Sequence, residues 1–231
     1  MRVIEFRGVT LQDGSRARLS NFDLSLDAGE RLVVFGASGS GKSDLLKVAA
    51  GVAAPASGTV SLLGPAQGRP APVGYVPNEG GLLNNLTLAQ NVALPALYHR
   101  LAARGEVEAR ARALLEEFGQ GGEADRRPSL ASAAARRMAQ LARALLVEPA
   151  LFVLEHPLED MDAGNARFIS AALERIRTDA KACAILGTRK LAPYLDWGSR
   201  FLLVGEGRFK LFSDKAELMQ NDDPAVRVFL Q

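Results

Sequence analysis

The sequence predicts an α/β fold with a mostly parallel sheet at its core, an antiparallel β portion at the N-terminus and an inserted helical subdomain. Short apolar runs alternate with helical patterns over most of the chain. Near the N-terminus, apolar and polar residues alternate, which is typical of a half-buried strand. Between residues 82 and 146 apolar residues recur instead at helical spacing. Ligands are therefore expected at the carboxyl ends of the parallel strands.

The strands are expected where apolar runs end at glycine, proline or asparagine turns. Before the helical stretch they cover residues 3–7, 21–26, 31–35, 58–64 and 73–76. After it they cover residues 151–155, 182–186, 201–204 and 208–212, of which the last two form a hairpin. A helix is expected from Asp44 to Ala50, after the loop at 36–43 that follows the strand at 31–35.

The longer helices are predicted from their apolar faces. The first face comprises Val107, Ala111, Leu114, Leu115 and Phe118. Ser132 can cap a second helix through about Val147, with the buried stripe Met138, Leu141, Ala142, Leu145 and Leu146. A third helix presents Phe168, Ile169, Ala172, Leu173 and Ile176. We expect one domain, with residues 1–77 and 148–231 as its core and residues 78–147 as the helical subdomain that includes the Ser132-capped helix.

Composition narrows the functional classes. The chain has 231 residues and a formal net charge of +2, so no excess of charge argues for binding nucleic acid or an acidic membrane. Its single cysteine, Cys183, lies in an apolar run, where we expect a buried residue in a reducing cytoplasm. No stretch approaches 18 uncharged apolar residues, so a function at a membrane would need a partner that spans it.

One segment carries a recognisable chemistry. The run Gly36-Ala37-Ser38-Gly39-Ser40-Gly41-Lys42-Ser43 is a complete G-x-x-x-x-G-K-S/T phosphate loop, preceded by a predicted strand and followed by a predicted helix. Glycines at 36, 39 and 41 allow successive backbone N–H groups to point into one concavity that binds phosphates. We expect Lys42 to reach the β- and γ-phosphates and the Ser43 hydroxyl to bind Mg²⁺.

A glycine-rich turn with a surface lysine is the alternative interpretation of this run. It is disfavoured because eight positions match the pattern and both flanking elements match as well.

Other short segments accompany this loop in a fixed order. They are Tyr75-Val76-Pro77-Asn78, Ala131-Ser132-Ala133-Ala134-Ala135, Leu151 to Glu155 with His156-Pro157, Asp162, and Thr188-Arg189. With the loop as Walker A, the series resembles the Q-loop, the LSGGQ-type signature, Walker B, the D-loop and the switch of ABC transporter ATP-binding subunits. The resemblance covers essentially the whole chain.

The resemblance implies ATP and Mg²⁺ as cofactors and transmembrane permease subunits as partners, on the cytoplasmic face of the inner membrane. It implies a head-to-tail pair, either two copies of this chain or one copy with another ATP-binding subunit. Nucleotide would contact residues from Gly36 to Asp44, with Ser43 and Glu155 around the metal. Ser132, Ala133 and Ala134 would contact the partner's nucleotide, and Asp162 would lie in the dimer interface.

The catalytic positions depart from the family pattern. His156 replaces the carboxylate that orients the attacking water, and Glu155 replaces the Walker B aspartate. Neutral imidazole accepts a proton, but its nitrogens have a different reach from a carboxylate. Asn78 is a shorter amide than the usual glutamine. Arg189 replaces the switch histidine, so it can pair with a phosphate but cannot shuttle a proton.

Two more departures concern recognition. Ala133 and Ala134 stand where glycines normally allow close approach to the partner's nucleotide. The position of the usual adenine-stacking ring, near Gln12 and Asp13, holds no aromatic residue. Together, these substitutions predict a subunit that binds nucleotide but hydrolyses it slowly or not at all.

Three functions remain open. The first is an ABC transporter subunit that couples nucleotide-driven closure to membrane partners. The second is a non-hydrolysing regulatory or structural subunit beside an active ATPase. The third, a phosphotransferase or GTPase, ranks below these because no Asn-Lys-x-Asp motif occurs. The tail from Asp223 to Leu230 is similar to that of Mce/Mla-type phospholipid-transport ATPases, which implies a lipid cargo.

Overall fold

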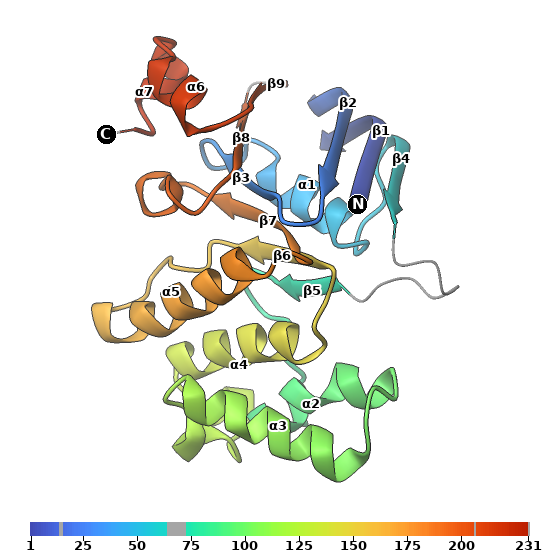
Figure 1. Cartoon of the computed structure of the whole chain (residues 1–231), viewed down its shortest axis with the longest axis vertical. Helices are drawn as coiled ribbons and strands as arrows, with labels where there is room; N and C mark the ends of the chain where they lie inside the picture. The colour runs from blue at the N-terminus through green and yellow to red at the C-terminus, as the bar shows by residue number, and fades with distance from the viewer. Residues whose placement is uncertain (14–15, 64–72, 206, 231) are drawn as a thin grey trace. The chain divides into compact units, whose positions relative to one another are not determined.

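The computed structural model describes residues 1–13, 16–63, 73–205 and 207–230. The chain divides into two compact units (Figure 1). The first contains Met1–Val73, Ala150–His156 and Ile176–Gln231, and the second contains Gly74–Pro149 and Pro157–Arg175. The expected division at residues 77 and 148 stays a prediction.

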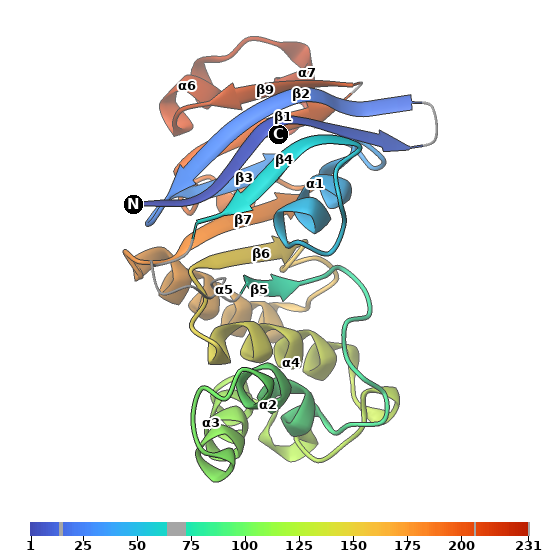
Figure 2. The same cartoon turned by 90° about the vertical axis from the view of Figure 1, so that its right-hand side faces the viewer.

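The first unit opens with an antiparallel sheet in the order β2-β1-β4. Its strands are β1 (Arg2–Asp13), β2 (Arg16–Asp27) and β4 (Ser57–Leu62). β1 and β2 both extend beyond the expected ranges, because they pair with each other over almost their whole length despite several register shifts. Figure 2 shows the three strands side by side.

A second, mostly parallel sheet of the first unit has the order β6-β7-β3-β8-β9. Its members are β3 (Arg31–Phe35), β6 (Leu151–Glu155), β7 (Cys183–Thr188), β8 (Arg200–Gly205) and β9 (Arg208–Phe212). Only the β8–β9 pair is antiparallel among these neighbours, as the hairpin pattern predicts. All residues of β6 and β7 are buried, which is why both strands are continuous apolar runs rather than alternating ones.

Helix α1 (Lys42–Ala49) follows β3 after the glycine-rich segment. Leu46 of α1 packs closely against β7, since a Cβ on Gly187 would lie 2.9 Å from its Cδ2. At the other end of the chain, α6 (Lys215–Gln220) and α7 (Pro224–Arg227) follow β9. The ring of Phe229 meets the ring of Phe35 edge to face at 5.5 Å, so the C-terminal segment packs against the end of β3.

The second unit contains β5 (Val73–Val76) from Gly74 onward and is mainly helical. Its helices are α2 (Leu88–Tyr98), α3 (Arg104–Glu117) and α4 (Ala133–Leu146). Short 3₁₀ helices occupy Gly121–Glu123 and Pro128–Leu130, and in the first unit Ala192–Tyr194. Helix α5 (Ala163–Thr178) begins in the second unit and ends in the first.

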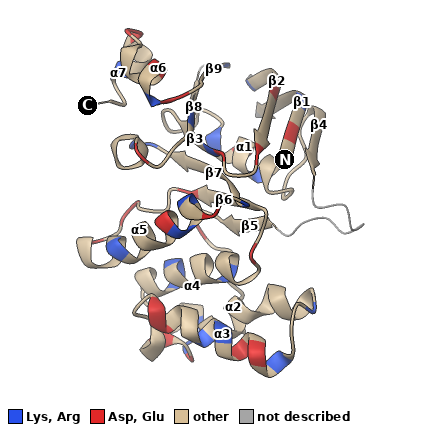
Figure 3. Ribbon diagram, in the orientation of Figure 1, with Lys and Arg blue, Asp and Glu red and all other residues tan. Residues whose placement is uncertain are grey.

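The expected apolar faces are largely buried. Every member of the α4 stripe is buried, whereas Leu114 of α3 and Phe168 of α5 are only half-buried. Leu114 lies beside the face formed by Val107, Ala111 and Leu115, so it meets the packed interface at its edge. Charged residues of both signs lie along α3 (Figure 3). No helix among the described residues is long and apolar enough to span a membrane.

Candidate functional site

The phosphate-loop sequence forms a strand, loop and helix, from β3 through Gly36 to α1. Gly36, Gly39 and Gly41 have φ values of 153°, 72° and 101°, which side chains rarely adopt. A Cβ on Gly36 would lie 2.2 Å from the carbonyl oxygen of Val204, and one on Gly41 would lie 2.9 Å from the Cβ of Arg18. Glycine is therefore required at both ends of the loop by space as well as by conformation.

The side chain of Lys42 folds into this loop. Its Nζ donates to the carbonyl oxygens of Gly36 at 2.8 Å and Ala37 at 2.7 Å, and to the Ser40 Oγ at 3.3 Å. Only 5% of the lysine is exposed. A buried ammonium group requires such acceptors, and an anionic phosphate would be a stronger one.

Two arginines contact the tip of the loop. Arg18 of β2 donates through Nη1 to the carbonyl oxygen of Gly39. Arg189, which follows β7, donates through Nη1 to the Ser38 Oγ at 3.3 Å. Sequence reasoning singled out Arg189 but missed Arg18, because its place in an alternating strand gives no local signal of a contact 21 residues away.

Parallel pairing brings the other predicted catalytic residues of the first unit to the same end of the sheet, where the carboxyl ends of its parallel strands lie. Gly187 of β7 is the register partner of both Glu155 on β6 and Val34 on β3. The carboxyl ends of these strands therefore carry Glu155 and His156, the loop, and Arg189. This end of the sheet is the candidate site.

Glu155 and His156 differ in environment. Glu155 is 4% exposed at the end of β6. His156 is half-buried and has φ 48°, an uncommon conformation for a residue with a side chain, and its backbone N–H donates to the carbonyl of Gly187 at 2.9 Å. Backbone strain of this kind concentrates at functional sites.

The donor set fits a nucleotide more directly than it fits a free metal ion. No group of three or more His, Cys, Asp or Glu residues in the described part of the chain could hold a metal. Ser43, in the first turn of α1, and Glu155 supply oxygen ligands of the kind Mg²⁺ takes together with substrate phosphates. Asp44 also lies in this first turn and is half-buried.

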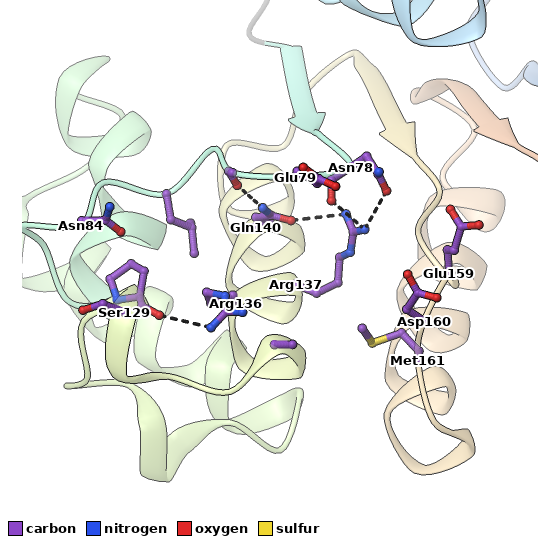
Figure 4. A pocket seen from close by; sticks show the side chains of 14 residues that line it. Asn78, Glu79, Asn84, Ser129, Arg136, Arg137, Gln140, Glu159, Asp160 and Met161 are labelled. Atoms are coloured by element: carbon purple, nitrogen blue, oxygen red, sulfur yellow. Dashed lines mark hydrogen bonds between the residues drawn. The ribbon is translucent and has the colours of Figure 1, made fainter. Parts of the chain in front are cut away.

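Asn78 belongs to the second unit, where α4 holds the segment that contains it. Arg137 of α4 donates to the carbonyl oxygens of Pro77 at 2.7 Å and Asn78 at 3.1 Å, and to the Asn78 Oδ1 at 3.5 Å. Gln140 donates to the carbonyl of Gly80 (Figure 4), and Arg143 donates to that of Gly81. We call Arg137, Gln140 and Arg143 the α4 clamp.

A pocket of about 630 Å³ lies beside the clamp. Figure 4 shows Arg136, Arg137 and Gln140 of α4 lining it together with Glu159, Asp160 and Met161. Arg136 also donates to the carbonyl oxygen of Ala131 at 2.6 Å. The pocket therefore combines charged groups of both signs with apolar surface.

The segment that resembles the signature, Ser132 to Ala134, lies at the start of α4. The Oγ of Ser132 accepts from the N–H of Ala135 at 3.0 Å, as expected of a helix cap, and its own N–H donates to Glu123 Oε2 at 2.9 Å. Ala133 is exposed and Ala134 is half-buried, so the methyl group of Ala133 lies on the surface. The carboxylate of Glu123 places negative charge beside this helix N-terminus.

Asp162 caps the start of α5. Its carboxylate accepts from the backbone N–H of Asn165 at 2.9 Å and from the Asn165 side chain at 2.6 Å. These hydrogen bonds hold the pKa of Asp162 below its ordinary value, with the backbone bond contributing most. The carboxylate is exposed, so it is accessible to a partner as well.

The predicted site residues thus fall into two groups. The first unit brings together the loop, Glu155, His156 and Arg189, while Asn78, Ser132 to Ala134 and Asp162 belong to the second unit. Gln12, near the position where the family usually has a base-stacking ring, is exposed on β1, and the side chain of Asp13 lies outside the described residues.

A strand, glycine-rich loop and helix at the edge of a parallel sheet are the architecture of nucleotide-binding α/β proteins that carry a phosphate loop. The ABC transporter family model matches residues 19–159, more than half of the chain. This chain therefore belongs to the ABC transporter family, as one of its ATP-binding domains.

Curated relatives agree with this assignment. The chain is 32% identical over 225 residues to the sulfate/thiosulfate import ATP-binding protein CysA of Bradyrhizobium diazoefficiens, covering 94% of this chain and 65% of that protein. It is 32% identical over 210 residues to the aliphatic sulfonates import ATP-binding protein SsuB 1 of Mesorhizobium japonicum, covering 91% and 78%. The chain thus spans just under two thirds of the length of the CysA relative.

Solved structures share the fold. The ATP-binding subunit of an ABC transporter has a TM-score of 0.79 and 25% identity, over 91% of this chain and 90% of that one. A dimeric ATP-binding cassette bound to ADP and Pi in a post-hydrolysis state has a TM-score of 0.78 and 23% identity, over 90% and 97%. The predicted α/β fold, with its mostly parallel and antiparallel sheets, is confirmed.

Proposed function

We propose that this chain is the ATP-binding subunit of an ABC importer and binds Mg-ATP through residues Gly36 to Asp44. The proposal rests on one observation: at the carboxyl end of β3, the glycine-rich loop surrounds the ammonium group of Lys42. Bound ATP would supply a triphosphate whose cleavage drives transport. Lys42 would hold its phosphates, and Ser43 and Glu155 would hold Mg²⁺ around it.

The chain's membrane partners follow from this function. We propose a head-to-tail pair of ATP-binding subunits on the cytoplasmic face of the inner membrane, docked on transmembrane permease subunits. Ser132, Ala133 and Ala134 would face the other subunit's nucleotide, and Asp162 would lie at the interface. The pair is either a homodimer or a heterodimer.

The cargo is proposed from the relatives alone. Those described above are named for the import of sulfate, thiosulfate and aliphatic sulfonates, which favours a small sulfur oxyanion. They give no support to the lipid cargo expected from the tail at residues 223–230.

We further propose that hydrolysis by this chain is slow. His156 offers an imidazole where a carboxylate orients water, and a displaced base loses much of the roughly 10²- to 10⁴-fold that such groups supply. Arg189 cannot pass on a proton. The methyl group of Ala133 and the carboxylate of Glu123 both oppose close approach of a partner's phosphate at the α4 N-terminus.

Binding and turnover measured on one preparation test the proposal. We expect the purified chain to bind Mg-ATP with micromolar to millimolar affinity, and Lys42→Ala to abolish binding. Turnover is expected far below the roughly 1 to 10³ s⁻¹ typical of enzymes. Unaltered binding by Lys42→Ala would overturn the phosphate-loop assignment, and rapid turnover by the chain alone would overturn slow hydrolysis.

Restoring the family residues separates the causes of slow turnover. The double variant Glu155→Asp, His156→Glu is expected to raise ATP turnover if two subunits still close over the nucleotide. No gain would place the defect at Ala133 and Ala134 instead. A gain seen only after an active ATP-binding subunit is added would favour the alternative function, a non-hydrolysing regulatory subunit in a heterodimer.

A further inference from the structure

Five successive residues of the phosphate loop, Gly36 to Ser40, offer acceptors to cationic side chains. Lys42 donates to the carbonyl oxygens of Gly36 and Ala37 and to the Ser40 hydroxyl. Arg189 donates to the Ser38 hydroxyl, and Arg18 donates to the carbonyl oxygen of Gly39. The three cations come from α1, from the segment after β7, and from β2. Only the lysine belongs to the loop motif itself.

The side chain of Arg18 packs against the phosphate loop along its length. Its Cβ packs where a side chain on Gly41 would otherwise lie, 2.9 Å from that hypothetical Cβ. Its Nη1 lies 3.8 Å from the position of a Cβ on Gly39. The stem of Arg18 is thus fitted to Gly41, and the hydrogen bond to the carbonyl oxygen of Gly39 holds the guanidinium group against the loop.

We propose that Arg18 is a nucleotide-binding residue whose guanidinium group binds the phosphate chain of the nucleotide. This inference rests on the proposed function of the loop. A neutral carbonyl is a weaker partner for guanidinium than a phosphate oxygen, because hydrogen bonds between two charged groups are shorter and about twice as strong. The planar guanidinium fork also matches two phosphate oxygens at once.

Charge explains why a third cation is useful here. A nucleoside triphosphate brings several negative charges into a loop whose motif supplies one lysine and backbone N–H groups. Arg18 adds a charge from β2, the strand that follows the segment where the family usually has an aromatic ring and this chain has none. Stacking of the guanidinium group on the base is the competing role, and the test below separates the two.

Binding of a non-hydrolysable nucleotide and of a base-free phosphate chain provides the test. Isothermal titration with Mg-AMPPNP and with magnesium tripolyphosphate would compare the wild-type chain with Arg18→Gln, which keeps an apolar stem against Gly41 but removes the charge. We expect the variant to bind both probes about 10-fold more weakly, the effect of losing one charge-assisted hydrogen bond. The loss should shrink at high salt.

Arg7→Gln serves as the matched control, because Arg7 lies on β1 in the same unit and is 71% exposed. It is expected to leave both affinities unchanged. Arg18→Lys should recover most of the affinity for both probes, because it restores the charge. A ligand-free melting temperature for each variant records any damage to the loop.

The results that overturn the proposal are distinct. Wild-type affinity of Arg18→Gln for both probes would show that Arg18 only supports the loop. A loss for AMPPNP without one for tripolyphosphate would assign Arg18 to the base. A lowered melting temperature with no recovery in Arg18→Lys would assign it to folding. If the wild-type chain binds neither probe, the proposed function fails and this inference fails with it.

Discussion

At the scale of single residues, the phosphate loop depends on glycines, whose lack of a side chain leaves room for neighbouring atoms. Gly36 leaves room for the carbonyl oxygen of Val204, and Gly41 leaves room for the stem of Arg18. Both glycines also have backbone conformations that side chains rarely adopt. A methyl group at either position would move backbone or a packed side chain.

Gly36→Ala is expected to destabilise the chain by about 1–3 kcal/mol or more, because its Cβ would lie 2.2 Å from a backbone oxygen that cannot rotate away. Thermal unfolding followed by circular dichroism would measure the loss. Gly105→Ala is the control: Gly105 lies in α3 with open space around its Cβ, so alanine should stabilise the helix by up to about 1 kcal/mol. Equal melting temperatures for the two variants would contradict this account.

At the scale of elements, α4 does more than bury an apolar stripe. Its clamp residues Arg137, Gln140 and Arg143 follow one another at three-residue spacing and bind carbonyl oxygens of residues 77, 78, 80 and 81. The segment after β5 has little regular structure of its own to satisfy these groups. The helix that Ser132 caps therefore also fixes the backbone around Asn78.

Arg137→Met should release this segment while keeping the apolar stem on α4. We expect faster hydrogen exchange in a peptide covering residues 77–83, with little change in the middle of α4. Arg136→Met is the matched control, since Arg136 is the preceding residue and donates instead to carbonyls of Pro128 and Ala131. Identical exchange of residues 77–83 in both variants would show that Arg137 does not hold the segment.

Local sequence patterns were enough to predict most helices and strands and the phosphate loop of the candidate site. The β3–loop–α1 unit and the Ser132 cap depend on neighbouring residues, so their chemistry is visible in a short window. Arg18 and the α4 clamp were not predicted, because they bind backbone oxygens 21 and about 60 residues away. Such contacts depend on tertiary packing and leave no residue pattern. The lengths of β1 and β2 were underestimated because bulges interrupt their alternation.

At the scale of the whole molecule, the parallel sheet forms the buried centre of the first unit. Cys183 begins β7, between β6 and β3, and is completely buried. Burial raises the pKa of its thiol to about 12. Since the chain has no other cysteine, any reaction with a thiol reagent measures the exposure of Cys183 in this sheet.

We expect native protein to react very slowly with a thiol reagent at pH 8, because the thiolate is the reactive form and Cys183 is neither ionised nor accessible. Between pH 7 and 9 the slow rate of the native chain should rise by roughly tenfold per pH unit, because its thiol stays far below its pKa. The rate of the urea-unfolded chain should level off, because its cysteine ionises near its ordinary pKa. Labelling followed by mass spectrometry would measure both rates. Rapid labelling of the folded protein would contradict the buried position.

The contacts of Lys42 within its own loop have a consequence for how tightly any anion can be held there. The ammonium group already donates to oxygens of Gly36, Ala37 and Ser40. An incoming anion must compete with these acceptors, so its net affinity reflects the difference between two sets of partners and not the strength of one.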